Sequence, residues 1–329
     1  MPSLPLSAVR RRRLLALLPA LPWAARPAQA QAATGWPQRA VKLLVGFPGG
    51  STPDLAARVL AEGLARAWGQ TVVVENRPGA AGNLAAAAVA QAGDDHTLGV
   101  VINGNLSTAA LLNPRLPFDP ARSFSLLSLL ATAPLVLVAP VDAPAGAAWF
   151  VAARQAAGRW NFGSVGIGSV GHLGMELLAG RAGFQATHVP YNGNPAVLTA
   201  LIAGQVQAAL VPPGLALPQV RAGRLRAIGL TGGRSVLAPE VPPLAEAGVR
   251  VDELEVWVAL VGPAALSGMA QQRLAQDVPA VLRDAAARQR LFNAGWQVQG
   301  TAAEALRLRV QQESRVLGAI IGSRGLRAE

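Results

Sequence analysis

Three glycines in this chain have the spacing of a nucleotide-binding motif. Gly166, Gly168 and Gly171 form a G-x-G-x-x-G run between an extended and a helical segment, the pattern of a loop that cradles a dinucleotide pyrophosphate. Such a site also needs an acidic residue about twenty positions further on, for the ribose hydroxyls. No Asp or Glu occurs between Glu176 and Glu240. The run therefore favours another anionic ligand, and a nucleotide-dependent oxidoreductase stays only as an alternative.

The other residues show no pattern typical of a catalytic or metal site. His96, His172 and His188 are scattered, with no H-E-x-x-H pattern and no carboxylate at ligand spacing. Ser169 lacks the glycine two positions before it that a nucleophile elbow requires. The chain also has no cysteine, so thiolate chemistry and disulfides are excluded. We expect no catalytic residue, no metal site and no cofactor.

What recurs instead is a strand, a turn and the start of a helix. Thr52 before Pro53 and Asp54 is a strong helix start, with a hydroxyl cap, proline in the first turn and an acid. Asn194-Pro195, the turn at 103–105 and Ser169 repeat the arrangement. The carboxyl ends of strands in open α/β sheets gather where such folds bind ligands, and helix N-termini suit carboxylate or phosphate groups. The sequence therefore predicts an anion site.

The elements that position these turns alternate along the chain. Apolar, β-rich runs at 40–47, 71–75, 97–102, 160–164, 186–189, 206–211 and 225–230 predict strands, with helices between them, so we expect parallel α/β architecture. Two longer runs at 134–140 and 254–262 are expected to cross between two lobes. Domain 1 is then 31–136 with 252–329, its helical tail packing back on the first lobe, and domain 2 is 137–251.

The N-terminus carries an export address. Arg10 to Arg13 precede an apolar run, and Ala28-Gln29-Ala30 offers a small-residue cleavage site, the order typical of a secretory signal peptide over 1–30. The net charge of +11 then falls to +6, with 24 basic and 18 acidic residues. No basic cluster interleaved with aromatic residues follows, so we expect no nucleic-acid partner and a periplasmic protein.

Several longer motifs carry a family resemblance. The chain reads F-P-G-G-S-T-P-D-L-A-A-R at 47–58, E-N-R-P-G-A-A-G-N at 75–83, G-S-V-G-I-G-S-V-G-H-L at 163–173 and V-P-Y-N-G at 189–193. In these motifs, and in their order over the mature chain, it resembles the substrate-binding proteins of tripartite tricarboxylate transporters, the Bug family. The resemblance implies a bilobal, type II-like periplasmic binding protein with two α/β domains joined by two crossing strands. It also implies a small di- or tricarboxylate or related organic acid between the lobes, a membrane permease as partner, and a monomer.

Carried over by position, the resemblance implies that the ligand is held by backbone amides, hydroxyls and bridging waters. The expected ligand-binding residues are Phe47, Gly49, Gly50, Ser51, Thr52, Asp54, Asn103, Asn105, Gly166, Gly168, Ser169, His172, Pro190, Tyr191, Asn192, Gly193 and Val211. Asn192 and Val211 replace a lysine and an aspartate that the family often has, and the missing aspartate disfavours ligands with an ammonium group. A sensor that presents its ligand to a membrane kinase would share this fold and remains an alternative.

Overall fold

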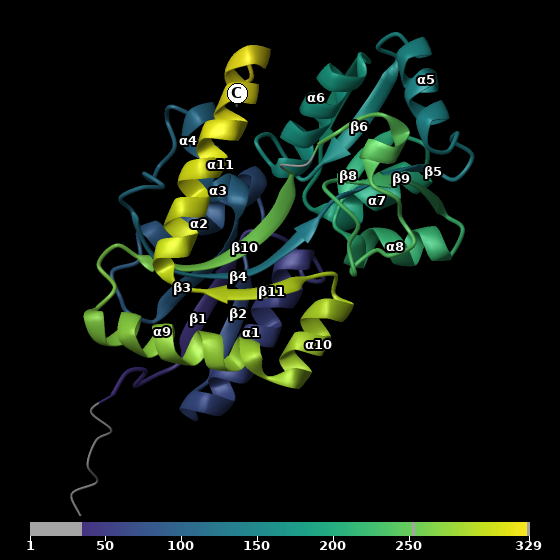
Figure 1. The fold of residues 1–329 in the computed structure, drawn as a ribbon. Coiled ribbons are helices and arrows are strands. Elements are labelled where there is room, and N and C mark those ends of the chain that lie inside the picture. Colours follow the sequence, from purple (N-terminus) through teal and green to yellow (C-terminus); the bar gives the residue numbers. More distant parts are fainter. Residues whose placement is uncertain (1–34, 252–253, 328–329) are drawn as a thin grey trace, which may run out of the picture. The chain divides into compact units, whose positions relative to one another are not determined.

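The computed structural model describes residues 35–251 and 254–327. The predicted signal peptide lies outside these residues. Gly35–Glu329 forms one compact unit, and its described part is treated below (Figure 1). None of the helices described is long and apolar enough to cross a membrane.

A six-stranded mixed sheet forms the centre of the first lobe. Its strands lie in the order β11 (Gln297–Thr301), β4 (Phe124–Pro134), β10 (Glu255–Pro263), β3 (Thr97–Ile102), β1 (Val41–Val45) and β2 (Val72–Asn76). The strands β2, β1 and β3 run parallel, whereas β10 and β4 pair antiparallel. The α/β class is confirmed, but the sheet is mixed rather than parallel, because β10 and β11 run opposite to β1, β2, β3 and β4.

Helices from both ends of the chain cover this sheet. They are α1 (Thr52–Trp68), α2 (Asn83–Ala90), α3 (Asn103–Ser107), α4 (Ala109–Leu112), α9 (Gly268–Arg283), α10 (Ala285–Asn293) and α11 (Ala303–Arg324), with the short η1 (Ala80–Gly82). In α1 the apolar residues share a buried face, and Gly69 ends the helix in a left-handed conformation. The helices α9 and α10 pack on α1, while α11 packs on β4 and α3 (Figure 1). The C-terminal helices thus complete the first lobe.

A five-stranded sheet forms the centre of the second lobe. Its order is β7 (Ala186–Pro190), β6 (Trp160–Ser164), β8 (Ala208–Val211), β5 (Val136–Pro140) and β9 (Leu225–Leu230). The strands β7, β6 and β8 run parallel and β5 pairs antiparallel with β8 and β9. The helices α5 (Ala147–Gln155), α6 (Val170–Ala182), α7 (Asn194–Ile202) and α8 (Pro213–Arg221) and the short η2 (Leu244–Ala247) accompany this sheet.

The chain passes from the first sheet to the second at Leu135, which separates β4 from β5. The 11-residue strand β4 has no counterpart in the sequence prediction, which placed the crossing run at 134–140. Buried Ser128 and Thr132 interrupt the apolar pattern of β4, and its pairing with β10 contains two register shifts, so the strand gives a weak period-two signal. The predicted domain boundaries at 136/137 and 251/252 remain predictions.

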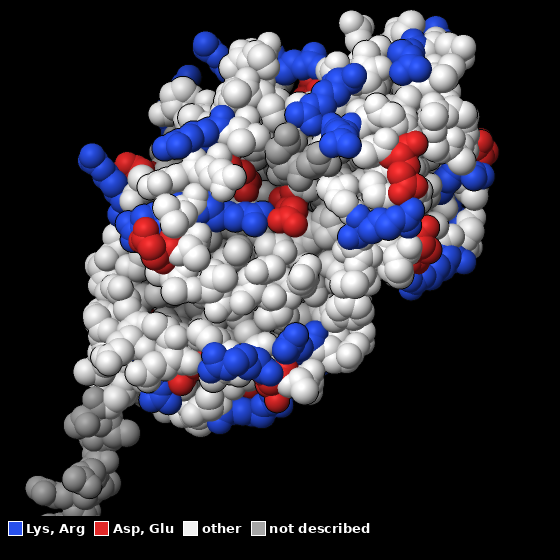
Figure 2. All heavy atoms as spheres, in the orientation of Figure 1, with Lys and Arg blue, Asp and Glu red and all other residues white. Residues whose placement is uncertain are grey.

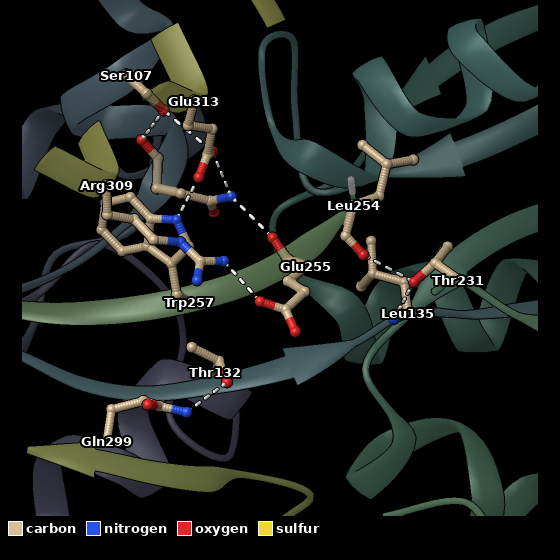
Figure 3. A network of polar contacts seen from close by, with 11 residues as sticks. Ser107, Thr132, Leu135, Thr231, Leu254, Glu255, Trp257, Gln299, Arg309 and Glu313 are labelled. Carbon is tan, nitrogen blue, oxygen red and sulfur yellow. Dashed lines mark hydrogen bonds and ion pairs between the residues drawn. The ribbon is translucent and has the colours of Figure 1, made fainter. Parts of the chain in front are cut away.

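One hydroxyl ties the two passages of the chain together. The Thr231 side chain accepts a hydrogen bond from the Leu135 amide and donates one to the Leu254 carbonyl, both at 2.8 Å and both buried. Leu135 precedes β5, and Leu254 precedes β10. Figure 3 shows Thr231 between these two residues. A single buried side chain therefore satisfies backbone groups that the crossing strands leave without a ladder partner.

A buried carboxylate anchors α11 beside this crossing. Glu313 accepts hydrogen bonds from Trp257 of β10, from Asn103 at 2.8 Å and from Ser107 at 3.2 Å, as Figure 3 shows for its labelled members. Burial raises the pKa of Glu313, although these donors act in the opposite direction. The Arg309–Glu255 pair, at 2.6 Å, adds a second link between α11 and β10.

Charged side chains of both signs are interspersed over the face drawn in Figure 2. Exposed ion pairs of the described residues include Arg234 with Glu246 at 2.7 Å and Arg221 with Glu240 at 2.6 Å. Exposed pairs contribute little to stability, so the fold rests on its apolar cores.

Replacing the crossing hydroxyl should be costly. We expect Thr231→Val to destabilise the protein by about 2–4 kcal/mol, because it leaves a buried amide and a buried carbonyl without a partner. The exposed Thr199 also bonds a carbonyl, that of Pro195, so Thr199→Val should stay within about 0.5 kcal/mol. Urea denaturation followed by circular dichroism measures both, and equal losses would contradict the role of Thr231.

Candidate ligand cleft

The loop between β1 and α1 is held from inside by a buried carboxylate. Asp54 is 1% exposed and accepts hydrogen bonds from the Gly50 amide at 2.8 Å, from Arg58 at 2.9 Å and from Asn76 at 2.8 Å. Asn76 also donates to the Phe47 carbonyl at 2.8 Å. Burial acts to raise the pKa of Asp54, but these hydrogen bonds outweigh it and lower that pKa. Asp54 is thus an ionised residue that shapes the loop.

Two hydroxyls at the start of α1 remain without a partner. Ser51 is 2% and Thr52 is 1% exposed, and neither Ser51 Oγ nor Thr52 Oγ1 has a hydrogen-bond partner among the described residues. Ser51 is the N-cap of α1, yet its side chain makes no capping hydrogen bond. Buried hydroxyls are normally bonded, so these two groups are free to meet a ligand.

The glycine-rich loop between β6 and α6 forms the facing wall. Gly166 and Gly168 have φ values of +128° and +83°, which only glycine adopts readily. Ser169 caps α6: its hydroxyl accepts from the His172 amide at 3.3 Å and donates to the Gly166 carbonyl at 2.8 Å. This loop is therefore satisfied internally, in contrast to the start of α1.

Two adjacent imidazoles, tilted by 33° to each other, support the loop. His172 Nδ1 accepts a hydrogen bond from the Gly168 amide at 3.2 Å, and His188 Nε2 lies 2.6 Å from Ser164 Oγ. The ring centroids lie 4.1 Å apart. Burial lowers the pKa of His172 to about 4; burial and the neighbouring His172 lower that of His188 to about 3. Both rings are neutral at pH 7, so they act as structural supports.

A small inner cavity lies between the two walls. It has a volume of about 40 Å³, room for a few water molecules. The first lobe and its crossing strands contribute Phe47, Ser51, Thr52, Pro53, Ile102, Leu135 and Val256, and the second lobe contributes Val165, Ser169, Val170, Gly171, Asn194, Leu210 and Pro212. The N-termini of α1, α6, α7 and α8 all reach this lining.

A larger outer cavity of about 370 Å³ shares Val165 with the inner one. Its first-lobe lining consists of Ala80, Ala81, Asn83, Ala109, Leu112 and Asn113, and its second-lobe lining of Val165, Gly166, Ile167, Pro190, Tyr191 and Asn192. The two cavities together are called the cleft below. Each has residues of both lobes on its walls, as expected for a ligand that bridges them.

The structure brings only part of the predicted set to the cleft. Phe47, Ser51, Thr52 and Ser169 line the inner cavity, and Gly166, Pro190, Tyr191 and Asn192 line the outer one. Gly49, Gly50, Gly168 and Gly193 belong to the same loops but line neither cavity. Asp54 and His172 are committed to loop shape, as described above. The ligand roles of all these residues remain predictions.

Three further predicted residues lie deeper in the fold. Asn103 donates to Glu313 and to the Glu255 carbonyl. Asn105 donates to the Ala81 carbonyl at 3.0 Å and to Asn83 at 2.8 Å, so it positions the outer wall from behind. Val211 is fully buried in an apolar cluster with Val136. None of the three lines either cavity.

Sequence reasoning missed several lining residues. Ala80, Ala81 and Asn83 belong to the E-N-R-P-G-A-A-G-N run, which was read as family identity without a site role. The left-handed φ values of Ala80 and Ala81 mark a constrained turn. Asn194 and Pro212 line the inner cavity, and the helix start at Asn194-Pro195 was the signal available for the first of them.

Glycines let the two lobes approach closely around the cleft. A Cβ on Gly166 would lie 2.9 Å from Ala81 Cβ, and one on Gly168 would lie 2.3 Å from Leu112 Cδ1. At a separate contact, a Cβ on Gly214 of α8 would lie 2.0 Å from the Ala294 carbonyl oxygen. A hydrogen bond of 2.8 Å from Thr108 Oγ1 to the Gly168 carbonyl adds a polar link. These contacts are called the seam.

A tryptophan connects the inner cavity to the C-terminal helices. Trp296 is 1% exposed, and its indole N–H donates to the Thr52 carbonyl at 3.0 Å. The contact ties the first turn of α1 to the segment between α10 and β11. It joins segments 244 residues apart.

Residues 56–326 match the family model described as the tripartite tricarboxylate transporter family receptor. The chain belongs to this family. It is 32% identical over 256 residues to Protein BugT of Bordetella pertussis, covering 76% of this chain and 78% of that one. The receptor family is one of binding proteins, so the chain is a solute-binding receptor and not an enzyme.

Solved structures of relatives share the fold. The Rhodopseudomonas palustris protein Rpa4515, solved with adipate, is 29% identical with a TM-score of 0.84, over 89% of this chain and 99% of that one. MatC from the same organism, solved with malate, is 29% identical with a TM-score of 0.81, over 87% and 100% of the chains. The structure of the periplasmic binding protein BugD matches with a TM-score of 0.83. The two-lobed periplasmic-binding-protein architecture is therefore confirmed.

The two imidazoles make stability depend on pH. Their folded pKa values of about 4 and about 3 lie below the ordinary 6.5. Below pH 6.5 the unfolded chain therefore binds more protons than the folded protein does. Stability from this source is complete above pH 6.5 and is lost as the pH falls toward 4 and 3. We expect the melting temperature to fall between pH 7 and pH 5.5.

Replacing one imidazole of the pair tests whether the two histidines cause this decrease in melting temperature. His188→Gln should make the decrease shallower, and by more than His96→Gln does, because burial lowers the pKa of His96 as well but His96 lies outside this pair. Differential scanning fluorimetry across the range measures the slopes. A slope unchanged in His188→Gln would show that other groups produce the pH dependence.

Proposed function

We propose that this receptor captures a small carboxylate in the cleft and delivers it to the membrane subunits of a tripartite tricarboxylate-type transporter. The observation that carries the proposal is the pair of free, buried hydroxyls on Ser51 and Thr52 at the N-terminus of α1. A helix N-terminus with unused donors suits a carboxylate without any basic side chain. The relatives solved with adipate and malate support the same ligand chemistry.

The family and the N-terminal export signal support a proposal for the protein's location and partners. We propose export by the signal peptide, cleavage near Ala30, and action as a monomer in the periplasm. Binding draws the lobes together at the seam, and the permease recognises the joined form. Asp54, Asn105 and His172 position the ligand-facing groups.

Removing the free hydroxyls should separate binding from folding. We expect the double variant Ser51→Ala, Thr52→Val to keep or raise the melting temperature of the unliganded protein, because it removes buried polar groups that lack partners. Ligand affinity should fall at least about tenfold, the effect of losing hydrogen bonds worth about 1.4 kcal/mol. Malate and adipate are the probes, and calorimetry gives their Kd.

The control for this pair is Ser323→Ala, whose hydroxyl donates to the Ile320 carbonyl at 3.1 Å on α11, away from the cleft. It should leave affinity unchanged. Wild-type protein should also gain about 2.7 kcal/mol of stability at a ligand concentration of one hundred times Kd. If no carboxylate in a broad panel raises the melting temperature and none co-purifies, the proposed function is wrong.

The seam gives a test of lobe closure. Gly214→Ala favours helix α8 locally by up to about 1 kcal/mol, but its Cβ collides with the Ala294 carbonyl across the seam. We expect the folded lobes to persist and the ligand Kd to rise about tenfold or more, because the competent joined state becomes less populated.

Gly268→Ala at the start of α9, where a Cβ would meet nothing within 4 Å, is the matched control and should bind normally. Small-angle scattering should show a larger radius of gyration for Gly214→Ala with ligand than for the control. Normal affinity and scattering in Gly214→Ala would contradict closure at this seam.

A further inference from the structure

A groove on the surface has walls from both lobes and shares none of its described lining residues with the inner or outer cavity. It has a volume of about 540 Å³. Val236, which lies between β9 and η2, contributes the second-lobe wall, and the first-lobe wall comes from the end of α9, from α10 and from β11. Because the two walls belong to different lobes, this groove is complete only when the lobes are joined.

Two arginines give the groove a positive charge. Arg283 at the end of α9 and Arg288 of α10 are exposed, and neither side chain has a hydrogen bond or an ion pair with another described residue. Asp284, between them in sequence, caps α10 by accepting a hydrogen bond from the Ala287 amide at 2.9 Å. No described lining residue is Asp or Glu, and Figure 2 shows basic side chains over α9 and α10. The groove therefore presents two cations to an acidic partner.

Apolar side chains lie in the same groove as these arginines. Val236 is 69% and Phe292 is 43% exposed, and Trp296 and Val298 continue the lining. Exposed apolar residues that are scattered singly need no explanation, but these two line one groove together with two arginines. Aromatic residues and arginine are the types that protein interfaces concentrate. The chemistry therefore fits a protein segment that carries carboxylates and a large apolar side chain.

The lining tryptophan connects this groove to the cleft. Trp296 donates a hydrogen bond to the Thr52 carbonyl at 3.0 Å, and Thr52 lines the inner cavity. Ala294, two residues before Trp296, forms part of the seam, where a Cβ on Gly214 would meet its carbonyl oxygen. A partner in the groove thus contacts the same segment between α10 and β11 that meets the second lobe at the seam.

We propose that this groove is the docking surface for the transporter's membrane subunits and binds an acidic segment of them that also carries a large apolar side chain. The proposal rests on the proposed function and names the surface through which that partner recognises the joined form. The carboxylates of the segment pair with Arg283 and Arg288, and its apolar side chain packs on Phe292 and Val236. A partner that contacts both lobes binds the joined form more tightly than the separated one.

Charge reversal tests this docking surface. The double variant Arg283→Glu, Arg288→Glu should keep the Kd for malate and adipate, measured by calorimetry, within about twofold, because neither arginine lines the cleft. Uptake of the labelled carboxylate into proteoliposomes that contain the membrane subunits should fall at least about tenfold, because like charges then face each other across the interface. The matched control is Arg159→Glu, Arg224→Glu, which changes the net charge equally at exposed second-lobe positions outside the groove and should retain uptake.

The outcomes separate the docking surface from the proposed function. Unchanged uptake with the groove variant, or an equal decrease with the control, would overturn the docking surface while carboxylate binding stands. Wild-type binding to phosphatidylglycerol vesicles, or dimerisation in sedimentation velocity, that the groove variant loses would assign the groove to lipid or to a second copy and also overturn the proposal. If the wild-type protein binds no carboxylate, or binds one without supporting uptake, the proposed function fails and the docking surface falls with it.

The second-lobe wall has its own test. Val236→Ser should keep the melting temperature and the Kd, because the side chain is mostly exposed. It should lower uptake about threefold or more, because it removes the apolar contact that the second lobe supplies. Val141→Ser, at a side chain that is 46% exposed and outside the groove, is the control and should retain uptake. Unchanged uptake with Val236→Ser would overturn recognition of both lobes through this groove.

Discussion

The hydroxyl of Thr231 marks the constraint on which this molecule depends. The chain leaves the first sheet at Leu135 and returns to it at Leu254, and both backbones meet on that one side chain. Each lobe has its own sheet, so this crossing is where the two sheets are connected along the chain. The neighbouring Glu313 network holds α11 against β10 and so keeps the first-lobe side of the crossing rigid.

Residues around the cleft divide into those whose polar groups are engaged in shaping loops and those whose polar groups have no partner. One group forms hydrogen bonds to backbone groups and neighbouring side chains; it consists of Asp54, Asn105, His172 and His188. Ser51 and Thr52 form the other group. No charged side chain is among the described residues that line the two cavities. The carboxylate of Asp54 and the two imidazoles lie behind the lining, where they fix the geometry of the loops.

Local pattern was sufficient to predict much of the fold. The expected strands at 97–102, 160–164 and 225–230 coincide with β3, β6 and β9, because short apolar runs bounded by turn residues define buried strands. The strand β4 was not predicted, because it contains polar residues that are buried by partners far along the chain. Ser128, for example, donates a hydrogen bond to the Thr301 carbonyl. The roles of Asn103 and Asp54 escaped for the same reason. A sequence displays a polar residue after a strand, but not whether Glu313 or Asn76 has already engaged it.

The bond from Trp296 to the Thr52 carbonyl gives the protein a built-in optical reporter. The indole is buried and its N–H is fixed on Thr52, a lining residue of the inner cavity whose hydroxyl has no partner. Any occupant that draws on the Thr52 hydroxyl changes the electrostatic field along this bond, and indole emission responds to that field. Trp296→Phe would then subtract the responsive component from the tryptophan emission of the mature protein, so that solute capture can be followed in real time without a label.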